Sequence, residues 1–196
     1  MKRVFDIIFS CFGLLILLPF FLIISCWVAL DSKGGVFYKQ ERIGKNRKPF
    51  QLLKFRTMRP DSFGKGALTI GSRDPRITGI GYYLRKFKLD ELPQLLNVLQ
   101  GDMSFVGPRP EVKKYVDMYS DEQLKVLSVS PGITDYASIK FRNESDLLAT
   151  AADPEKMYTE EIMPEKLRLN LEYINDNSVW KDVMIIFNTF YTIIKE

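Results

Sequence analysis

The longest apolar stretch of the chain lies near its start, where residues 7–30 carry no charged side chain. A straight helix of this length would reach about 36 Å, which is enough to cross a bilayer. Pro19 lies near its middle and is expected to break or kink the helix, leaving two arms. Basic residues flank the stretch on both sides, which suits a segment whose two ends stay on the cytoplasmic face. Two topologies remain open: a spanning helix, and a re-entrant membrane hairpin over residues 1–31 that breaks near Pro19.

Near the centre of the chain, apolar residues return at helical spacing, at Leu92, Leu95, Leu96 and Leu99. Pro93 is tolerated only in a first helical turn, so Asp90 and Glu91 are expected at or just before the helix N-terminus. Free backbone N–H groups there favour carboxylates and can also bind a phosphate. The helix should end near Gly101, and the stiff turn that follows presents Arg109. Acidic residues at a helix start are usually ordinary caps, so the pair alone does not indicate a site.

The rest of the pattern predicts an α+β domain over residues 32–196, built of helices and a few short strands. Residues 36–38 and 50–55 are typical of extended segments around a turn at 44–46. Further along, we expect a loop over 60–82, a basic amphipathic helix over 82–89, a helix over 111–128, a strand or extended loop over 135–143, and an acidic, mainly helical stretch over 144–176. The last stretch, residues 179–194, is too polar to span a bilayer and suits an interfacial helix or core packing.

Composition removes several kinds of chemistry. The chain of 196 residues has no histidine, which excludes an imidazole base and a histidine-liganded metal. Its two cysteines, Cys11 and Cys26, both lie in the apolar stretch, so neither a zinc cluster nor a disulfide scaffold is expected. The glycines of residues 60–82 do not match a phosphate-binding P-loop. Carboxylates remain as the natural reactive groups, and they suit Mg²⁺ shared with a substrate's phosphates.

The net charge of +4 hides a strongly basic segment over residues 33–59. This segment holds nine basic residues and one acidic residue, a local charge of +8. Directly after a membrane segment, such a patch often holds anionic lipid headgroups. Aromatic and apolar residues interleave with the charges, which favours a folded surface that binds a polyanionic substrate. Both interpretations stay open, and we do not expect a nucleic-acid partner.

A set of short motifs follows in a fixed order through nearly the whole chain. They are Lys54-Phe55-Arg56-Thr57-Met58, Asp74-Pro75-Arg76-Ile77-Thr78, Leu84-Arg85-Lys86, Leu89-Asp90-Glu91-Leu92-Pro93-Gln94-Leu95, Asn97-Val98-Leu99, Gly101-Asp102-Met103-Ser104, Val106-Gly107-Pro108-Arg109-Pro110 and Pro131-Gly132-Ile133-Thr134. Each motif is weak by itself, but the ordered set is highly specific. In these motifs the chain resembles the bacterial sugar transferases, specifically the small monotopic phosphoglycosyl transferases.

The resemblance implies a re-entrant helix broken at a proline and a catalytic domain on the cytoplasmic face of the bacterial inner membrane. It also implies a Mg²⁺-dependent reaction in two half-steps. A nucleotide-diphosphate sugar, with uridine as the expected base, is attacked by an aspartate and releases the nucleoside monophosphate. A polyprenol phosphate, expected to be undecaprenyl phosphate, then accepts the sugar phosphate. Carried over by position, Asp90 is the nucleophile and Glu91 its metal-associated partner.

The same resemblance makes Arg85 and Arg109 phosphate contacts, and we add Lys54 and Arg56 from the basic segment. Two departures from the family pattern stand out. Leu18-Pro19 replaces the Ser-Pro that many members carry at the break, and Asp135-Tyr136-Ala137-Ser138 replaces Gly-Trp-Ala-Gln. We expect the second departure to bear on the sugar-nucleotide pocket, for which the candidates are Asp135, Tyr136 and Arg142. The family's usual sugars therefore cannot be assumed, and the oligomeric state, a homodimer included, stays open.

Two other functions compete with the phosphoglycosyl transferase. In one, the protein is a non-catalytic membrane-surface module whose basic segment binds anionic lipid and whose Asp90 and Glu91 are only helix caps. In the other, it is a glycosyl transferase that releases a nucleoside diphosphate, but the Asp-x-Asp metal motif of such enzymes is absent from the sequence. The identity of the released nucleotide separates these functions.

Overall fold

Helices dominate the fold, with a few short strands, as the α+β expectation requires. The computed structural model describes residues 2–62 and 68–195, without the side chain of Ile194, so residues 63–67 of the expected loop lie outside the described residues. The strands are β1 (Phe37–Ile43), β2 (Pro49–Phe55), β3 (Ser104–Val106) and β4 (Gly132–Thr134). The helices are α1 (Lys2–Asp31), α2 (Gly79–Lys86), α3 (Gln94–Gln100), α4 (Lys113–Val116), α5 (Tyr136–Lys140), α6 (Glu144–Ala149), α7 (Pro154–Met157), α8 (Met163–Asn175) and α9 (Val179–Ile194).

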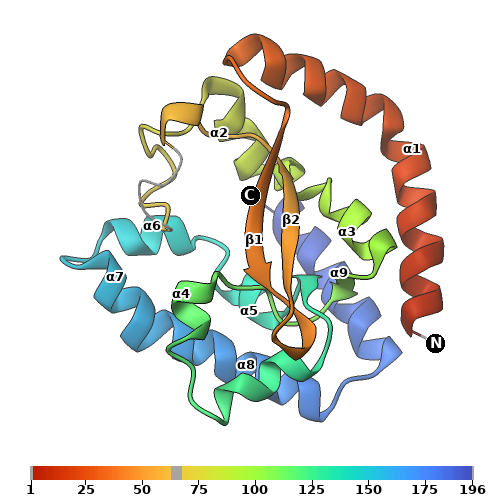
Figure 1. Ribbon diagram of the computed structural model, residues 1–196, viewed down its shortest axis with the longest axis vertical. Helices are drawn as coiled ribbons and strands as arrows, with labels where there is room; N and C mark the ends of the chain where they lie inside the picture. The colour runs from red at the N-terminus through yellow and green to blue at the C-terminus, as the bar shows by residue number, and fades with distance from the viewer. Residues whose placement is uncertain (1, 63–67, 196) are drawn as a thin grey trace.

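The apolar N-terminal stretch forms one continuous helix, α1, that passes through Pro19. Two separate arms were expected, but Figure 1 shows a single helix that curves along one side of the molecule. A proline removes one backbone hydrogen bond and bends a helix without having to end it. By length and composition α1 could cross a membrane, and 11% of its most apolar window is buried against the protein. Most of its apolar side chains therefore face outward.

Polar side chains near the start of α1 attach it to the rest of the chain. Asp6 is buried, and its Oδ1 accepts hydrogen bonds from the Ser104 hydroxyl at 3.0 Å and from the Phe105 N–H at 3.2 Å. Arg3 donates to the Leu99 carbonyl at 2.8 Å and also to the Val98 carbonyl, both in the last turn of α3. Helix C-termini leave such carbonyls unpaired, so Arg3 acts as their cap.

The end of α1 is closed by Arg56, one of the expected phosphate contacts. Its guanidinium is buried and donates to the carbonyls of Val28 at 3.2 Å, Ser32 at 2.6 Å and Lys33 at 3.0 Å. These are the unpaired carbonyls of the helix end and the turn after it. The guanidinium is thus committed to the backbone of α1, and we drop Arg56 from the expected phosphate ligands.

The two expected extended segments pair as an antiparallel hairpin, β1–β2, from Phe37 opposite Phe55 to Ile43 opposite Pro49. The hairpin runs between α1 on one side and α6 and α7 on the other (Figure 1). Asn97 of α3 ties it to the core, because its side chain accepts from the Leu53 N–H at 3.0 Å and donates to the Gln51 carbonyl at 2.8 Å.

Two other expectations are wrong in detail. Residues 111–128 form the short helix α4 and a separate 3₁₀ turn (Gln123–Ser128) in place of one helix. Residues 135–143 were expected to be extended, yet they contain helix α5. The cause is Asp135, whose side chain caps α5 by accepting from the Ser138 N–H. Gly101 does end α3, with a φ of 99° that suits glycine.

The placement of Arg56 predicts a loss of stability on substitution. In Arg56→Met, buried carbonyls at the end of α1 lose their donor, at a cost of about 1–3 kcal/mol for each group left unpaired. We expect a thermal midpoint several degrees lower in detergent, measured by intrinsic fluorescence. Arg59→Met is the matched control because Arg59 is exposed. If both variants had equal thermal midpoints and only Arg56→Met had a higher KM for the nucleotide sugar, Arg56 would again count as a phosphate ligand.

Candidate active site

A backbone turn at Lys88 brings Arg85 and Asp90, two residues of the expected site, to the same cleft. Lys88 has a left-handed conformation, with a φ of 56°, between α2 and the 3₁₀ turn Leu89–Glu91. This conformation is uncommon for a lysine and reverses the chain direction there. Arg85 at the end of α2 and Asp90 therefore line the same cleft, although five positions separate them in sequence.

Asp90 is 5% exposed, and among the described residues no hydrogen-bond partner reaches its Oδ1. Burial raises the pKa of Asp90, while the positive charges of Lys54 and Arg85 oppose this rise. A carboxylate with a bare oxygen, held in a cleft between cations, is arranged to react or to bind a metal ion rather than to cap a helix.

Glu91, the next residue, is fully engaged by two cations. Arg109 donates from Nη2 to Oε1 at 2.5 Å and from Nη1 to Oε2 at 3.1 Å. Lys54 donates to Oε1 at 3.0 Å. Burial alone would raise the pKa of Glu91, but Arg109 and Lys54 outweigh it and hold this pKa well below its usual range. Glu91 is therefore ionised and fixes the direction of both cations.

Arg109 is positioned from behind by Asp135, which is completely buried. Asp135 accepts from the Arg109 backbone N–H at 3.0 Å and from the Ser138 N–H at 2.5 Å, so one carboxylate joins the turn after β3 to helix α5. The Arg109 side chain also donates to the Ile133 carbonyl at 3.3 Å. Asp135, expected in the sugar-nucleotide pocket, is a buried support of Arg109 and does not line the cleft.

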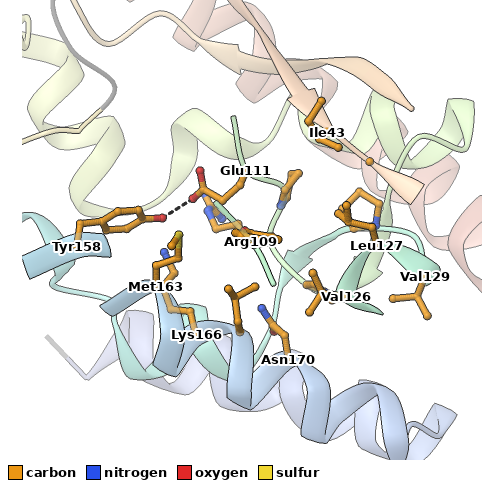
Figure 2. A pocket seen from close by; sticks show the side chains of 16 residues that line it. Ile43, Arg109, Glu111, Val126, Leu127, Val129, Tyr158, Met163, Lys166 and Asn170 are labelled. Carbon is orange, nitrogen blue, oxygen red and sulfur yellow. Dashed lines mark hydrogen bonds between the residues drawn. The ribbon is translucent and has the colours of Figure 1, made fainter. Parts of the chain in front are cut away.

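The turn that carries Arg109 is also held by Glu111. Figure 2 shows Glu111 pointing toward the Tyr158 hydroxyl, which donates to it at 2.6 Å. Arg42 of β1 donates to the other carboxylate oxygen at 3.3 Å, and the Ile43 N–H donates to the Glu111 carbonyl at 2.9 Å. A cavity of about 30 Å³ lies below this turn, large enough for one water molecule. The hairpin, the turn that carries Arg109 and the helical turn Tyr158–Ile162 before α8 thus support one another.

The site opens into a cleft of about 610 Å³. Basic side chains in its wall outnumber acidic ones by nine to four, which favours a polyanionic ligand. Its basic lining residues are Arg42, Lys54, Arg56, Arg76, Arg85, Lys88, Arg109, Arg142 and Lys166. Of the remaining pocket candidates, Arg142 lines the cleft and donates to the Thr192 carbonyl, whereas Tyr136 packs edge-on against Tyr173 away from it.

The basic segment of residues 33–59 is divided by the fold. Arg42, Lys54 and Arg56 turn inward, as described above. Its other six basic residues are exposed, and they are Lys33, Lys39, Lys45, Arg47, Lys48 and Arg59. The two interpretations of this segment therefore apply to different side chains, since the inward ones serve the cleft and the fold while the outward ones are available to a lipid surface.

Asp90 and Glu91 carry carboxylate oxygens, which are the kind of ligand that Mg²⁺ prefers. In residues 2–62 and 68–195, no group of three or more Asp, Glu, His or Cys side chains could enclose a metal ion. Mg²⁺ commonly uses only one or two carboxylates and completes its shell with water and substrate phosphates. The bare Oδ1 of Asp90 meets this requirement directly. Glu91 would meet it only with Arg109 or Lys54 turned away from the carboxylate, because both now donate to it.

Sequence reasoning missed Lys88, Arg42 and Lys166 as residues of the cleft. Lys88 lies in a run that reads as an ordinary basic helix face, and lysine gives no signal for a left-handed turn. Arg42 was counted only as part of the basic segment. Lys166 lies in α8, in a stretch whose acidic excess indicates a solvated surface.

The support from Asp135 predicts a graded effect on stability. Asp135→Ala leaves two N–H groups without an acceptor and removes the cap of α5, a loss of about 2 kcal/mol, or roughly 4–8 °C in thermal midpoint for a chain of this size. Asp135→Asn keeps one oxygen acceptor and should lose less. Asp121→Ala, at an exposed position, is the control. If Asp135→Ala were as stable as this control, the bridge between Arg109 and α5 would not hold the site.

Comparisons with known proteins show which family the chain resembles. The family model described as bacterial sugar transferase matches residues 1–196. A Bacillus subtilis protein, named a putative undecaprenyl-phosphate N-acetylgalactosaminyl 1-phosphate transferase, is 46% identical over 121 residues, covering 62% of this chain and 68% of the relative. The UDP-glucose:undecaprenyl-phosphate glucose-1-phosphate transferase of Escherichia coli is 37% identical over 97% of this chain but only 39% of its own length.

A third relative matches along most of both chains. It is the exopolysaccharide production protein ExoY of Rhizobium meliloti, 34% identical over 96% of this chain and 83% of the relative. The aligned length, the whole-chain match of the family model and the ordered motifs around Asp90 lead to the same assignment. This chain belongs to the bacterial sugar transferase family.

Proposed function

We propose that this protein transfers a sugar 1-phosphate from a UDP-sugar to undecaprenyl phosphate and releases UMP, as the first membrane step of a bacterial glycoconjugate pathway. The observation that carries the proposal is the buried carboxylate of Asp90, whose Oδ1 is bare in a basic cleft. The names of the relatives supply the two substrates. The cleft suits both of them, because each brings phosphate groups.

In the first half-reaction Asp90 attacks the phosphorus that carries the sugar. An Oδ–P bond forms, the P–O bond to the leaving phosphate breaks, and UMP departs with that electron pair. The carboxylate must be ionised to attack, and Lys54 and Arg85 favour the ionised form against the effect of burial. The same cations reduce the repulsion between the carboxylate and the diphosphate.

Glu91 and Arg109 prepare the site for the diphosphate. Glu91 holds the side chains of Arg109 and Lys54 in place. Both cations are therefore already oriented when the UDP-sugar binds. Mg²⁺, when bound by Asp90 and Glu91, would neutralise charge on the diphosphate and on the departing UMP. Arg109 can then exchange its Glu91 contact for a phosphate oxygen.

The second half-reaction regenerates the carboxylate. A phosphate oxygen of undecaprenyl phosphate attacks the phosphorus on Asp90, a new P–O–P bond forms, and the Asp90 Oδ–P bond breaks. The product is an undecaprenyl diphosphate sugar. The acceptor is confined to the bilayer, so the cleft must lie at the membrane. We propose that α1 enters the inner membrane and returns to the cytoplasmic face, with its bend near Pro19 inside the bilayer.

The direct test measures UMP release from a panel of UDP-sugars with detergent-solubilised protein, undecaprenyl phosphate and Mg²⁺. We expect release with at least one sugar, and a loss of about a thousandfold or more in Asp90→Asn, which keeps the side-chain shape but not the nucleophile. Asp121→Asn is the control. Release of UDP would indicate glycosyl transfer instead. Salt-sensitive liposome binding by folded protein without any nucleotide release would favour the membrane-surface module.

The electrostatics of Asp90 predict a pH effect. Its raised pKa means that activity should fall, as pH decreases, at a higher pH than for an ordinary carboxylate. Lys54→Met removes a charge that opposes this rise, so the acid limb of kcat/KM for UMP release should move to still higher pH. Lys39→Met, at an exposed position of β1, should leave the limb in place. A limb that stays fixed or moves to lower pH in Lys54→Met would show that Asp90 does not control it.

A further inference from the structure

The residues that line the cleft include a second set of charged side chains, apart from those around Asp90. Two further carboxylates belong to this set, Glu111 and Glu144. Glu111 pairs with Arg42, and Glu144 Oε2 accepts a hydrogen bond from Lys166 Nζ at 2.8 Å. We propose that Glu144 and Lys166 bind hydroxyl groups of the donor sugar and so help to select it, an assignment that rests on the proposed function.

The charge of this pair suits the uncharged part of the donor. Lys54, Arg85 and Lys88 lie close enough to Asp90 for their positive charges to favour its ionised form, which suits the diphosphate. Glu144 and Lys166 instead neutralise each other. A carboxylate accepts hydrogen bonds and an ammonium group donates them, whereas a hydroxyl does both. Two neighbouring hydroxyls of a sugar ring can therefore bond to the carboxylate and the ammonium group together.

Both members of the pair keep hydrogen-bonding capacity for a ligand. Within residues 2–62 and 68–195, the Glu144 carboxylate accepts only from Lys166, through Oε2, which leaves Oε1 available. That bond uses one of the three N–H donors of the lysine. The side chains of Glu144 and Lys166 are 26% and 13% exposed, and both residues line the cleft. The pair is thus held in place by its surroundings and still open to the cleft.

The pair lies beside the turn that carries Arg109. Lys166 Nζ is 5.2 Å from the centre of the Tyr158 ring, and the hydroxyl of this tyrosine donates to Glu111 at 2.6 Å (Figure 2). Glu111 follows Arg109 by two positions, and Arg109 and Lys166 both line the small cavity below the turn. In the proposed reaction Arg109 contacts the diphosphate, to which the sugar is directly bonded. The pair is therefore placed to meet the sugar.

The position of the pair in the sequence agrees with a role in selecting the sugar. Two of the relatives described above are named for different sugars, N-acetylgalactosamine and glucose. A side chain that selects the sugar is therefore expected outside the motifs that carry the common reaction. Glu144 and Lys166 lie outside all of the ordered motifs, and Glu144 follows the segment in which this chain departs from the family pattern.

The test compares the donor sugar with its deoxy analogues. For the UDP-sugar that the unmodified protein uses best, kcat/KM for UMP release is measured beside analogues that each lack one hydroxyl. We expect Glu144→Ala to lower kcat/KM by about tenfold or more for the full sugar, but by less than about twofold for the analogue without the recognised hydroxyl. A merely structural role would lower both values equally. Glu144→Gln keeps an oxygen acceptor and should retain more activity than Glu144→Ala.

A neighbouring ion pair supplies the matched control. Lys140 Nζ and Glu165 Oε1 lie 2.7 Å apart and join α5 to α8, but neither residue is among the described residues that line the cleft. Glu165→Ala removes a carboxylate next to Lys166 in the chain and should leave kcat/KM for every sugar within about twofold of its original value. A change in sugar preference in this variant as large as that in Glu144→Ala would contradict the assignment.

Inhibition by UMP separates recognition of the sugar from recognition of the nucleoside, because UMP lacks the transferred sugar. In Glu144→Ala we expect the Ki for UMP to stay within about twofold of its original value. A Ki that rises as much as the KM for the UDP-sugar, or an equal loss of activity for the full sugar and every deoxy analogue, would overturn the assignment. If the unmodified protein releases no UMP from any UDP-sugar, the proposed function itself fails, and the assignment fails with it.

Discussion

The ion pair between Glu91 and Arg109 is the interaction on which the site depends. It joins the turn before α3 to the turn after β3, two segments that are otherwise held by different parts of the core. A largely buried pair does not by itself add much stability, because desolvation offsets the attraction. Its effect is on geometry, since a guanidinium bonded to both carboxylate oxygens has one orientation. Asp135 and Glu111 extend this order to α5, to β1 and to the helical turn Tyr158–Ile162 that precedes α8.

A second constraint is that α1 exposes a long apolar surface and is still attached to the rest of the domain. The outer surface of α1 is apolar, so apolar packing alone would not hold this helix on the domain in preference to a bilayer. Polar contacts at its two ends hold it there. Asp6 and Arg3 attach the first turns, while Arg56 and Asp31 attach the last, with Asp31 accepting from the Ile80 N–H at 2.9 Å. These contacts fix α1 over α3, the helix that follows Asp90 and Glu91 in the chain.

The sequence predicted those parts of the fold that depend on local signals. The hairpin, the start of α3 after Pro93 and its end at Gly101 all follow from turn residues and periodicity. Helix α5 could not be predicted in that way, because its cap is a buried aspartate whose partners include Arg109, distant in sequence. Arg56 shows the same limit. Its motif marks the residue as important, but only the folded chain shows that its guanidinium closes a helix.

The charge arrangement suits the role proposed for Asp90, which attacks the phosphorus of the first substrate and is then displaced by the phosphate of the second. Burial raises the pKa of Asp90, whereas full exposure would leave its carboxylate hydrated and a weaker nucleophile. The site avoids both outcomes, because Lys54 lies close enough to lower the cost of ionisation while its hydrogen bond goes to Glu91. The Oδ1 of Asp90 therefore stays free of hydrogen-bond donors. Each incoming phosphate would meet the same basic side chains of the cleft. In the proposed reaction a single carboxylate thus takes part in both half-steps.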